Sequence, residues 1–229
     1  MDFDSAAKIK RIVVFLNRAY GKPVRTRMAD PVDELIATVL SQNTTDKNSL
    51  SAFALLKRGF RSWDELLHVP VRRLARLIKS AGLANIKAAR IMDILHEIKR
   101  REGRIDLSSL KRLNVGDSLG YLTSLKGVGP KTAACVLLFS LGKPALPVDT
   151  HVFRVTKRLG LIDEAVTREK AHVALSEIVP KALIYEFHLG IIEHGRRTCK
   201  APNPRCGSCV LYRICAFESK ACFKRRTKA

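Results

Sequence analysis

The chain has 229 residues and carries 42 Lys and Arg against 21 Asp and Glu, a formal net charge of +21. This excess indicates a polyanionic partner, with nucleic acid favoured over an anionic membrane surface or an acidic protein. Apolar residues make up 46% of the sequence, which excludes disorder throughout, and the longest uncharged apolar stretch, 132–142, is too short to span a bilayer. We therefore expect a cytoplasmic protein, nucleoid-associated in a prokaryote, without membrane contact.

Helical periodicity dominates the chain from its N-terminus onward. Apolar residues between 32 and 40 recur at the spacing of one helix face, Asp30 is a suitable N-cap, and Pro31 suits the first helical position. Alternating strand patterns bounded by hairpin turns are not evident, so the predicted fold class is all-α. The further helices predicted are 5–18, 46–59, 70–79, 85–101, 149–159, 167–178 and 181–196.

The densest run of turn-forming residues is Leu-Lys-Gly-Val-Gly-Pro-Lys-Thr-Ala at 125–133. Gly127 and Gly129 make a tight turn, and Pro130 suits the start of a second helix that is predicted to run on through the apolar residues to Leu141. Unpaired N–H groups at the start of that helix favour an anion such as a phosphate. From spacing alone, an ordinary pair of helices joined by a glycine turn is an equally good interpretation.

This hairpin, the Gly/Pro-rich loop at 142–147 and the aspartate at 149 resemble the helix-hairpin-helix (HhH-GPD) DNA glycosylases. Within that superfamily the chain is similar to the endonuclease III branch, because a polar Ser-x-x-x-Thr-Asp helix end occurs at 41–46 and a cysteine cluster lies near the C-terminus. The resemblance covers about residues 30–215.

The resemblance implies a two-lobed all-α fold with a C-terminal iron–sulfur loop. A six-helix domain would span 28–145, and residues 1–27 would join 146–229 in a discontinuous iron–sulfur cluster domain. The cleft between the two lobes would hold Lys131 and Asp149.

The implied activity is that of a bifunctional DNA glycosylase/AP lyase of base excision repair, a monomer that removes oxidised pyrimidines from duplex DNA and nicks the strand. Lys131 would supply the amine that attacks C1′ and forms a Schiff base, and Asp149 the carboxylate that stabilises positive charge on the sugar. The alternatives are a phosphate contact for Lys131 and a helix N-cap for Asp149, a task that one carboxylate could combine with catalysis.

Chemistry on a stacked base requires that the nucleotide be flipped out of the duplex. By resemblance, Asn43 or its neighbour Gln42 fills the gap and Leu83 wedges the opposite strand; the alternatives are a helix C-cap for the first two and a core position for Leu83. The DNA-binding residues implied are Gln42, Asn43, Leu83, Gly127, Gly129 and Thr132.

Two alternative functions stay open, a mismatch-specific DNA glycosylase of the same superfamily and a non-catalytic DNA-binding module. Basic runs at 72–79 and 154–158 are predicted to include at least one phosphate contact. His151 is interpreted as a structural hydrogen-bonding residue rather than a general base.

Four cysteines with 6-2-5 spacing lie near the C-terminus: Cys199, Cys206, Cys209 and Cys215. In a basic intracellular protein thiols stay reduced, so metal ligation is favoured over disulfides. The uneven gaps leave a structural zinc ion and an iron–sulfur cluster equally open. The same spacing occurs in the endonuclease III iron–sulfur pattern, so the resemblance implies a [4Fe–4S] cluster with a structural role. Cys135 is predicted to be a core residue, and Cys222 is assigned no function.

Overall fold

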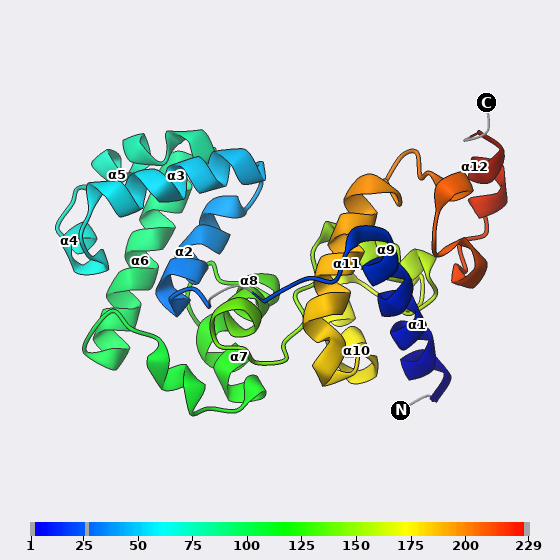
Figure 1. The fold of residues 1–229 in the computed structure, drawn as a ribbon. Helices are drawn as coiled ribbons and strands as arrows, with labels where there is room; N and C mark the ends of the chain where they lie inside the picture. The colour runs from blue at the N-terminus through cyan, green and yellow to red at the C-terminus, as the bar shows by residue number, and fades with distance from the viewer. Residues whose placement is uncertain (1–2, 26–27, 227–229) are drawn as a thin grey trace. The chain divides into compact units, whose positions relative to one another are not determined.

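Figure 1 shows the fold in a computed structural model, which describes residues 3–25 and 28–226. The described residues form helices and turns without any β-strand, which confirms the predicted all-α class. None of the described helices is both long enough and apolar enough to cross a bilayer. Contacts divide the chain into two compact units, a central unit of residues 27–143 and a terminal unit of residues 1–26 with 144–229. The boundary residues 26 and 27 lie outside the described part.

The central unit is built from α-helices joined by short turns. They are α2 (Pro31–Ser41), α3 (Asp46–Gly59), α4 (Trp63–Leu67), α5 (Val71–Leu77), α6 (Ala84–Glu102), α7 (Val115–Thr123) and α8 (Pro130–Cys135), with 3₁₀ turns η1 (Lys79–Ala81) and η2 (Ser108–Lys111). Helix α2 packs against α3, α6 and α8, and the long helix α6 packs against α5 (Figure 1). This arrangement brings the end of α2 next to the start of α8.

The start of α2 is the one that the sequence predicts. The Asp30 carboxylate accepts the N–H groups of Val32 and Asp33, and Pro31 occupies the first turn. Such a cap contributes about 1 kcal/mol to helix stability. The apolar stripe from Leu35 to Leu40 is buried, so α2 forms the centre of the unit's core.

The helix predicted over 132–141 is confirmed as far as residue 140, but it changes type in its second half. Helix α8 ends at Cys135, and a π-helix, Val136–Ser140, continues the segment. A π-helix holds more residues per turn than an α-helix, and it occurs mostly as a single wide turn. Nearly every residue between 132 and 140 is buried, so the sequence shows no polar face from which the change of helix type could have been predicted.

The terminal unit combines the first helix of the chain with the last third of the sequence. Its helices are α1 (Phe3–Tyr20), α9 (Thr150–Arg158), α10 (Arg168–Ile178), α11 (Ile184–Arg197) and α12 (Lys220–Arg226), with 3₁₀ turns η4 (Lys181–Leu183), η5 (Cys206–Ser208) and η6 (Tyr212–Ile214). Helix α11 packs against both α1 and α9. A Cβ at Gly190 would lie 3.2 Å from the Leu16 side chain, so the small residue lets α1 approach α11 closely.

Candidate active site and cysteine segment

The predicted hairpin is formed by α7, a turn and α8. Gly127 has a φ of +85°, a conformation that L-residues rarely adopt, and a Cβ there would overlap the side chain of Arg90. Gly129 has a φ of −89° and caps α8, and a Cβ there would meet no atom within 4 Å. Gly127 is therefore required by the turn itself, whereas Gly129 keeps open space above the first N–H groups of α8.

Lys131 lies in the first turn of α8 and is half-buried. Its charge acts on Glu34, a half-buried residue of α2. Burial raises the pKa of the Glu34 carboxyl, while a 3.2 Å hydrogen bond from the Thr38 hydroxyl and the nearby Lys131 ammonium lower it. Glu34 could not be predicted as a site residue from its position, because a Glu in the first turn of a helix is usually a solvated partner of the helix dipole.

Gln42, the first of the two predicted gap-filling candidates, is half-buried and held by hydrogen bonds. It is the C-cap of α2, its side-chain oxygen accepts a 2.7 Å hydrogen bond from Arg90, and its amide nitrogen lies 3.4 Å from the Thr132 hydroxyl. Thr132 itself is buried. The C-cap alternative therefore holds for Gln42, and its side chain connects α2, α6 and the hairpin.

Asn43 and Leu83 are the two non-glycine residues with positive φ among those that the structure describes. Their φ angles are 52° and 48°. Asn43 is exposed, and 54% of Leu83 is exposed, so the core alternative for Leu83 does not hold. Leucine in this conformation is strained by about 1–3 kcal/mol, a cost that structures accept chiefly at functional sites.

Asp149 is the N-cap of α9 in the terminal unit. Its Oδ1 accepts the N–H of Val152 at 2.7 Å, and no hydrogen bond reaches Oδ2 from the described residues. The carboxylate is half-buried. The capping alternative therefore holds, and the second oxygen stays available for another task.

His151 and Arg154 follow Asp149 on α9. The Arg154 guanidinium donates to His151 Nδ1 at 3.1 Å and to the carbonyl of Gly195 at 3.0 Å. His151 therefore accepts a hydrogen bond within the protein, in line with the structural interpretation. Arg154 and Arg158 both bond inward to carbonyls, so the basic run at 154–158 is in part a structural element rather than a free basic edge.

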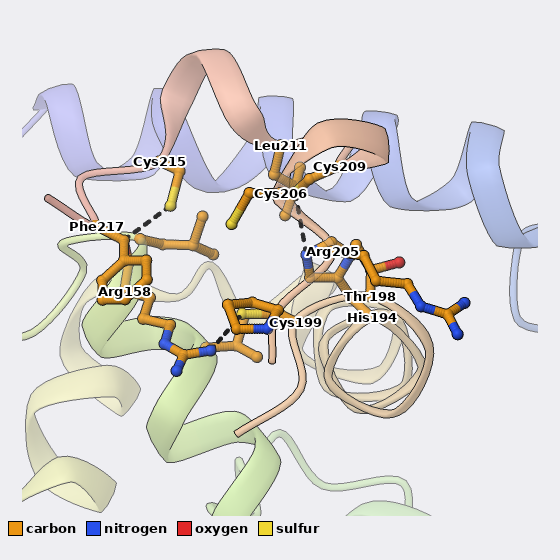
Figure 2. Close-up of a pocket in the computed structure, with 13 residues that line it drawn as sticks. Arg158, His194, Thr198, Cys199, Arg205, Cys206, Cys209, Leu211, Cys215 and Phe217 are labelled. Carbon is orange, nitrogen blue, oxygen red and sulfur yellow. Dashed lines mark hydrogen bonds between the residues drawn. The ribbon is translucent and has the colours of Figure 1, made fainter. Parts of the chain in front are cut away.

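The four predicted cysteines line one cavity in the terminal unit, together with residues of α9 and α11 (Figure 2). Cys215 donates to the carbonyl of Arg158 at 3.1 Å, and the Arg158 guanidinium donates to the Cys199 sulfur at 3.4 Å. His194 Nε2 lies 3.6 Å from the Cys209 sulfur. The Arg158 side chain also donates to the carbonyls of residues 200 and 201. Arg158 therefore joins α9 to both ends of the cysteine segment, through its side chain at residues 199–201 and through its backbone carbonyl at Cys215.

The thiols have only partial charge compensation, because Arg158 and Lys220 lower the pKa of Cys206 less than its surroundings raise it. Burial, and then the other thiols, raise the pKa of Cys206, and burial raises the pKa of Cys209 to about 12. Within residues 3–25 and 28–226, no three Cys, His, Asp or Glu side chains surround a single ion position. The donor set itself suits a thiolate-bound group, because bound metal ions would offset the cost of gathering four thiolates, one buried and three half-buried. Four cysteine sulfurs lining one cavity are therefore a donor set that fits the [4Fe–4S] cluster implied by the resemblance.

Known proteins are similar to this chain in both sequence and fold. The HhH-GPD superfamily of base excision DNA repair proteins matches residues 36–181. The chain is 38% identical over 206 residues to endonuclease III of Thermotoga maritima, with 90% of each sequence covered. It is 39% identical over 165 residues, 72% of its length, to a longer Arabidopsis thaliana protein, of which it spans 56%. A solved endonuclease III, trapped as a covalent intermediate with DNA, superposes with a TM-score of 0.80 at 29% identity, covering 96% of this chain and 98% of the other.

Proposed function

Because the chain belongs to the endonuclease III family of the HhH-GPD superfamily of base excision DNA repair proteins, we propose that it is a bifunctional DNA glycosylase/AP lyase. It removes oxidised pyrimidines from duplex DNA and then nicks the strand. The observation that carries the proposal is Lys131, an amine in the first turn behind the hairpin's two glycines and half-buried beside Glu34. In a hairpin that served binding alone, Lys131 would contact a phosphate and would form no covalent bond to DNA.

Lys131 supplies the nucleophile in this proposal. Its neutral amine attacks C1′, the new N–C1′ bond replaces the bond to the damaged base, and the base leaves with the electron pair and takes up a proton. The C1′–O4′ bond then breaks, with O4′ taking up a proton, and the open sugar carries a Schiff base between C1′ and Lys131. The Schiff base permits β-elimination, in which C2′ loses a proton, the C3′–O bond breaks and the 3′ phosphate departs. The lysine must lose its proton before its amine can attack.

Asp149 supplies the charge that stabilises the transition state. As the bond to the base breaks, positive charge grows on the sugar, and a fixed carboxylate lowers the energy of that state. Oδ1 is held by the N–H of Val152, which fixes the carboxylate, while Oδ2 is available to the sugar. The capping bond therefore prepares the group for catalysis.

Asn43 and Leu83 are proposed to enter the duplex, Asn43 into the vacated position and Leu83 against the opposite strand. Both are exposed and are held in left-handed backbone conformations. The N–H groups behind Gly129 are proposed to bind a DNA phosphate. The partner is double-stranded DNA with a damaged base or an abasic site, bound by a monomer.

Cys199, Cys206, Cys209 and Cys215 are proposed to hold a [4Fe–4S] cluster. When bound, the cluster supplies a rigid cross-link that folds the segment between Cys199 and Cys215. Arg158 and His194 contact three of the four sulfurs and orient them from α9 and α11. The cluster takes no part in the bond-breaking steps.

A panel of defined duplexes tests the proposal. The purified protein is incubated with duplexes that contain thymine glycol, a G·T mismatch, an A·8-oxoguanine pair or an abasic site, and the cut strands are recorded. We expect cleavage at thymine glycol and at the abasic site. If the mismatch duplexes were cut and the thymine glycol duplex were not, the result would support a mismatch glycosylase instead. If the abasic duplex and all the others stayed uncut, only a binding module would remain.

A further inference from the structure

A buried lysine of α6 joins the two loops that carry Asn43 and Leu83. Only 2% of Lys87 is exposed. Its ammonium donates one hydrogen bond to the carbonyl of Leu40 and one to the carbonyl of Ala81, each at 2.7 Å. Leu40 comes three residues before Asn43, and Ala81 comes two residues before Leu83. One cation therefore fixes the distance between the two chain segments immediately before the exposed residues.

Both carbonyls lie where a cation is stabilised. Leu40 is in the last turn of α2 and Ala81 ends the turn η1, so each carbonyl belongs to the unpaired, negative end of a helical segment. Burial, and then the nearby Arg90 guanidinium, lower the pKa of Lys87. No carboxylate among the described residues forms an ion pair with it. The group is costly to keep charged, and its two bonds compensate that cost by joining the loops.

Further bonds hold the same two segments in place. Ser80 of η1 donates to the carbonyl of Asn48 in the first turn of α3, directly after the loop of Asn43. The N–H of Lys87 donates to the carbonyl of Leu83 at 3.0 Å, which places Leu83 one helical turn before the ammonium. Asn43 and Leu83 are thus the exposed ends of one braced assembly, with Lys87 at its centre.

We propose that Lys87 is a positioning residue that sets the spacing between Asn43 and Leu83, so that both enter one duplex in the same binding event. The inference rests on the proposed function, because it assumes that these two residues open the DNA. When their separation is fixed, Asn43 and Leu83 can act on both strands at once. If the two loops were mobile, part of the binding free energy would be lost in ordering them. The strain at Leu83 is maintained because the brace over-determines that backbone.

The test compares a substrate that must be opened with one that holds no base at the site. The first is a duplex with a paired thymine glycol, and the second has an abasic site opposite an abasic analogue. We expect Lys87→Met to lower the single-turnover rate on the paired lesion about tenfold relative to wild type, because opening the duplex costs a few kcal/mol that the probes supply. The rate on the base-free site falls by less than about threefold. A 2-aminopurine beside the lesion shows a correspondingly smaller rise in fluorescence.

Lys99→Met is the matched control, since Lys99 lies on the same helix and pairs with Asp64 away from both loops. Lys99→Met removes the same charge, and we expect it to leave unchanged the ratio of the rate on the paired lesion to the rate on the base-free site. If Lys87→Met does not fold, Lys87→Arg replaces it in the test. This variant keeps the charge, but its larger, planar guanidinium cannot take the place of the ammonium between the two carbonyls. We expect Lys87→Arg to lower the same rate ratio.

A folded Lys87 variant with the wild-type ratio, or one in which both rates fall equally, would overturn the inference. Wild-type protein that cuts neither substrate would instead remove the proposed function.

Discussion

The backbone of Gly127 lies directly against the side chain of Arg90, in a conformation with a φ of +85°. This relationship separates the two glycines of the hairpin. We expect Gly127→Ala to lower the free energy of unfolding by about 1–3 kcal/mol, because the new Cβ is both strained and obstructed. Gly129→Ala changes it by less than about 0.5 kcal/mol, since that position has an ordinary φ and open space. Urea unfolding measures both.

DNA binding by the folded Gly129→Ala variant completes this comparison. If the hairpin N–H groups bind a phosphate, the added methyl group occupies the approach of the DNA backbone and weakens affinity for an abasic duplex, as measured by fluorescence anisotropy. Unchanged affinity in this variant would show that the phosphate binds elsewhere.

Lys131→Ala should abolish trapping of the protein on abasic DNA by borohydride, because no Schiff base forms without the amine. Lys126→Ala is the control: Lys126 lies in the same hairpin and its side chain is 89% exposed, so the substitution removes an equal charge from the same surface. Trapping by Lys126→Ala stays at the wild-type level. A covalent product from the Lys131 variant would assign the nucleophile to another residue.

Asp149→Asn and Asp149→Ala together separate the two tasks of the carboxylate. Asparagine is as good an N-cap as aspartate, so Asp149→Asn keeps the helix start, whereas Asp149→Ala costs about 1 kcal/mol of stability. Both variants lose the charge opposite the sugar, and both should slow base removal by about 10²-fold or more. Single-turnover kinetics and thermal unfolding provide the two readouts. If Asp149→Asn removed the base at the wild-type rate, the role of Asp149 would be that of a helix cap alone.

Much of the fold could be predicted because local chemistry determines it. The cap at Asp30 and Pro31 and the helix over 46–59 follow from side chains adjacent in sequence. The π-helix could not be predicted, since it depends on how a wholly buried segment fits its neighbours. The left-handed backbone of Leu83 could not be predicted either, because leucine disfavours it and only tertiary contacts impose it.

The positions of basic side chains were the least predictable part of the site. Arg154 and Arg158 were interpreted as a basic edge, but their guanidinium groups bond to backbone carbonyls around the cysteine segment. Lys87 carried a signal that was missed: it lies four residues before Ile91, on the apolar face of α6, where a solvated lysine is not expected. A charge in an apolar stripe indicates a buried polar contact.

If each of the four thiolates is a cluster ligand, as proposed, Cys209→Ser should lower the iron content from about four atoms per chain and remove the visible absorption of the cluster. Cys222→Ser, at an exposed position outside the 6-2-5 spacing, should leave both unchanged. Elemental analysis decides between iron and zinc. About one zinc ion per chain and no iron would contradict the cluster assignment while keeping the cysteines as ligands.

The pH dependence of stability should carry the signature of Glu34. Burial raises the pKa of its carboxyl, so the folded state binds the proton more tightly than the unfolded chain. The stability contributed by such a group is present below the ordinary Glu pKa of about 4.3 and is lost as the pH rises through the higher folded value. Glu34→Gln cannot titrate. We therefore expect it to gain stability relative to wild type as the pH rises from 4.5 upward, until the folded pKa is passed.

Glu97→Gln is a control of opposite sign. Hydrogen bonds from Arg100 and Arg101 lower the pKa of Glu97 to about 2, so its contribution is complete above the ordinary Glu pKa and disappears only as the pH falls toward the lower value. Across pH 5 to 8, a range of about three units above the ordinary Glu pKa, urea midpoints of Glu97→Gln should therefore stay at a constant offset from wild type. If Glu34→Gln shows the same constant offset over this range, its carboxyl is ionised like a solvated one, and the electrostatic neighbourhood described for Lys131 is wrong.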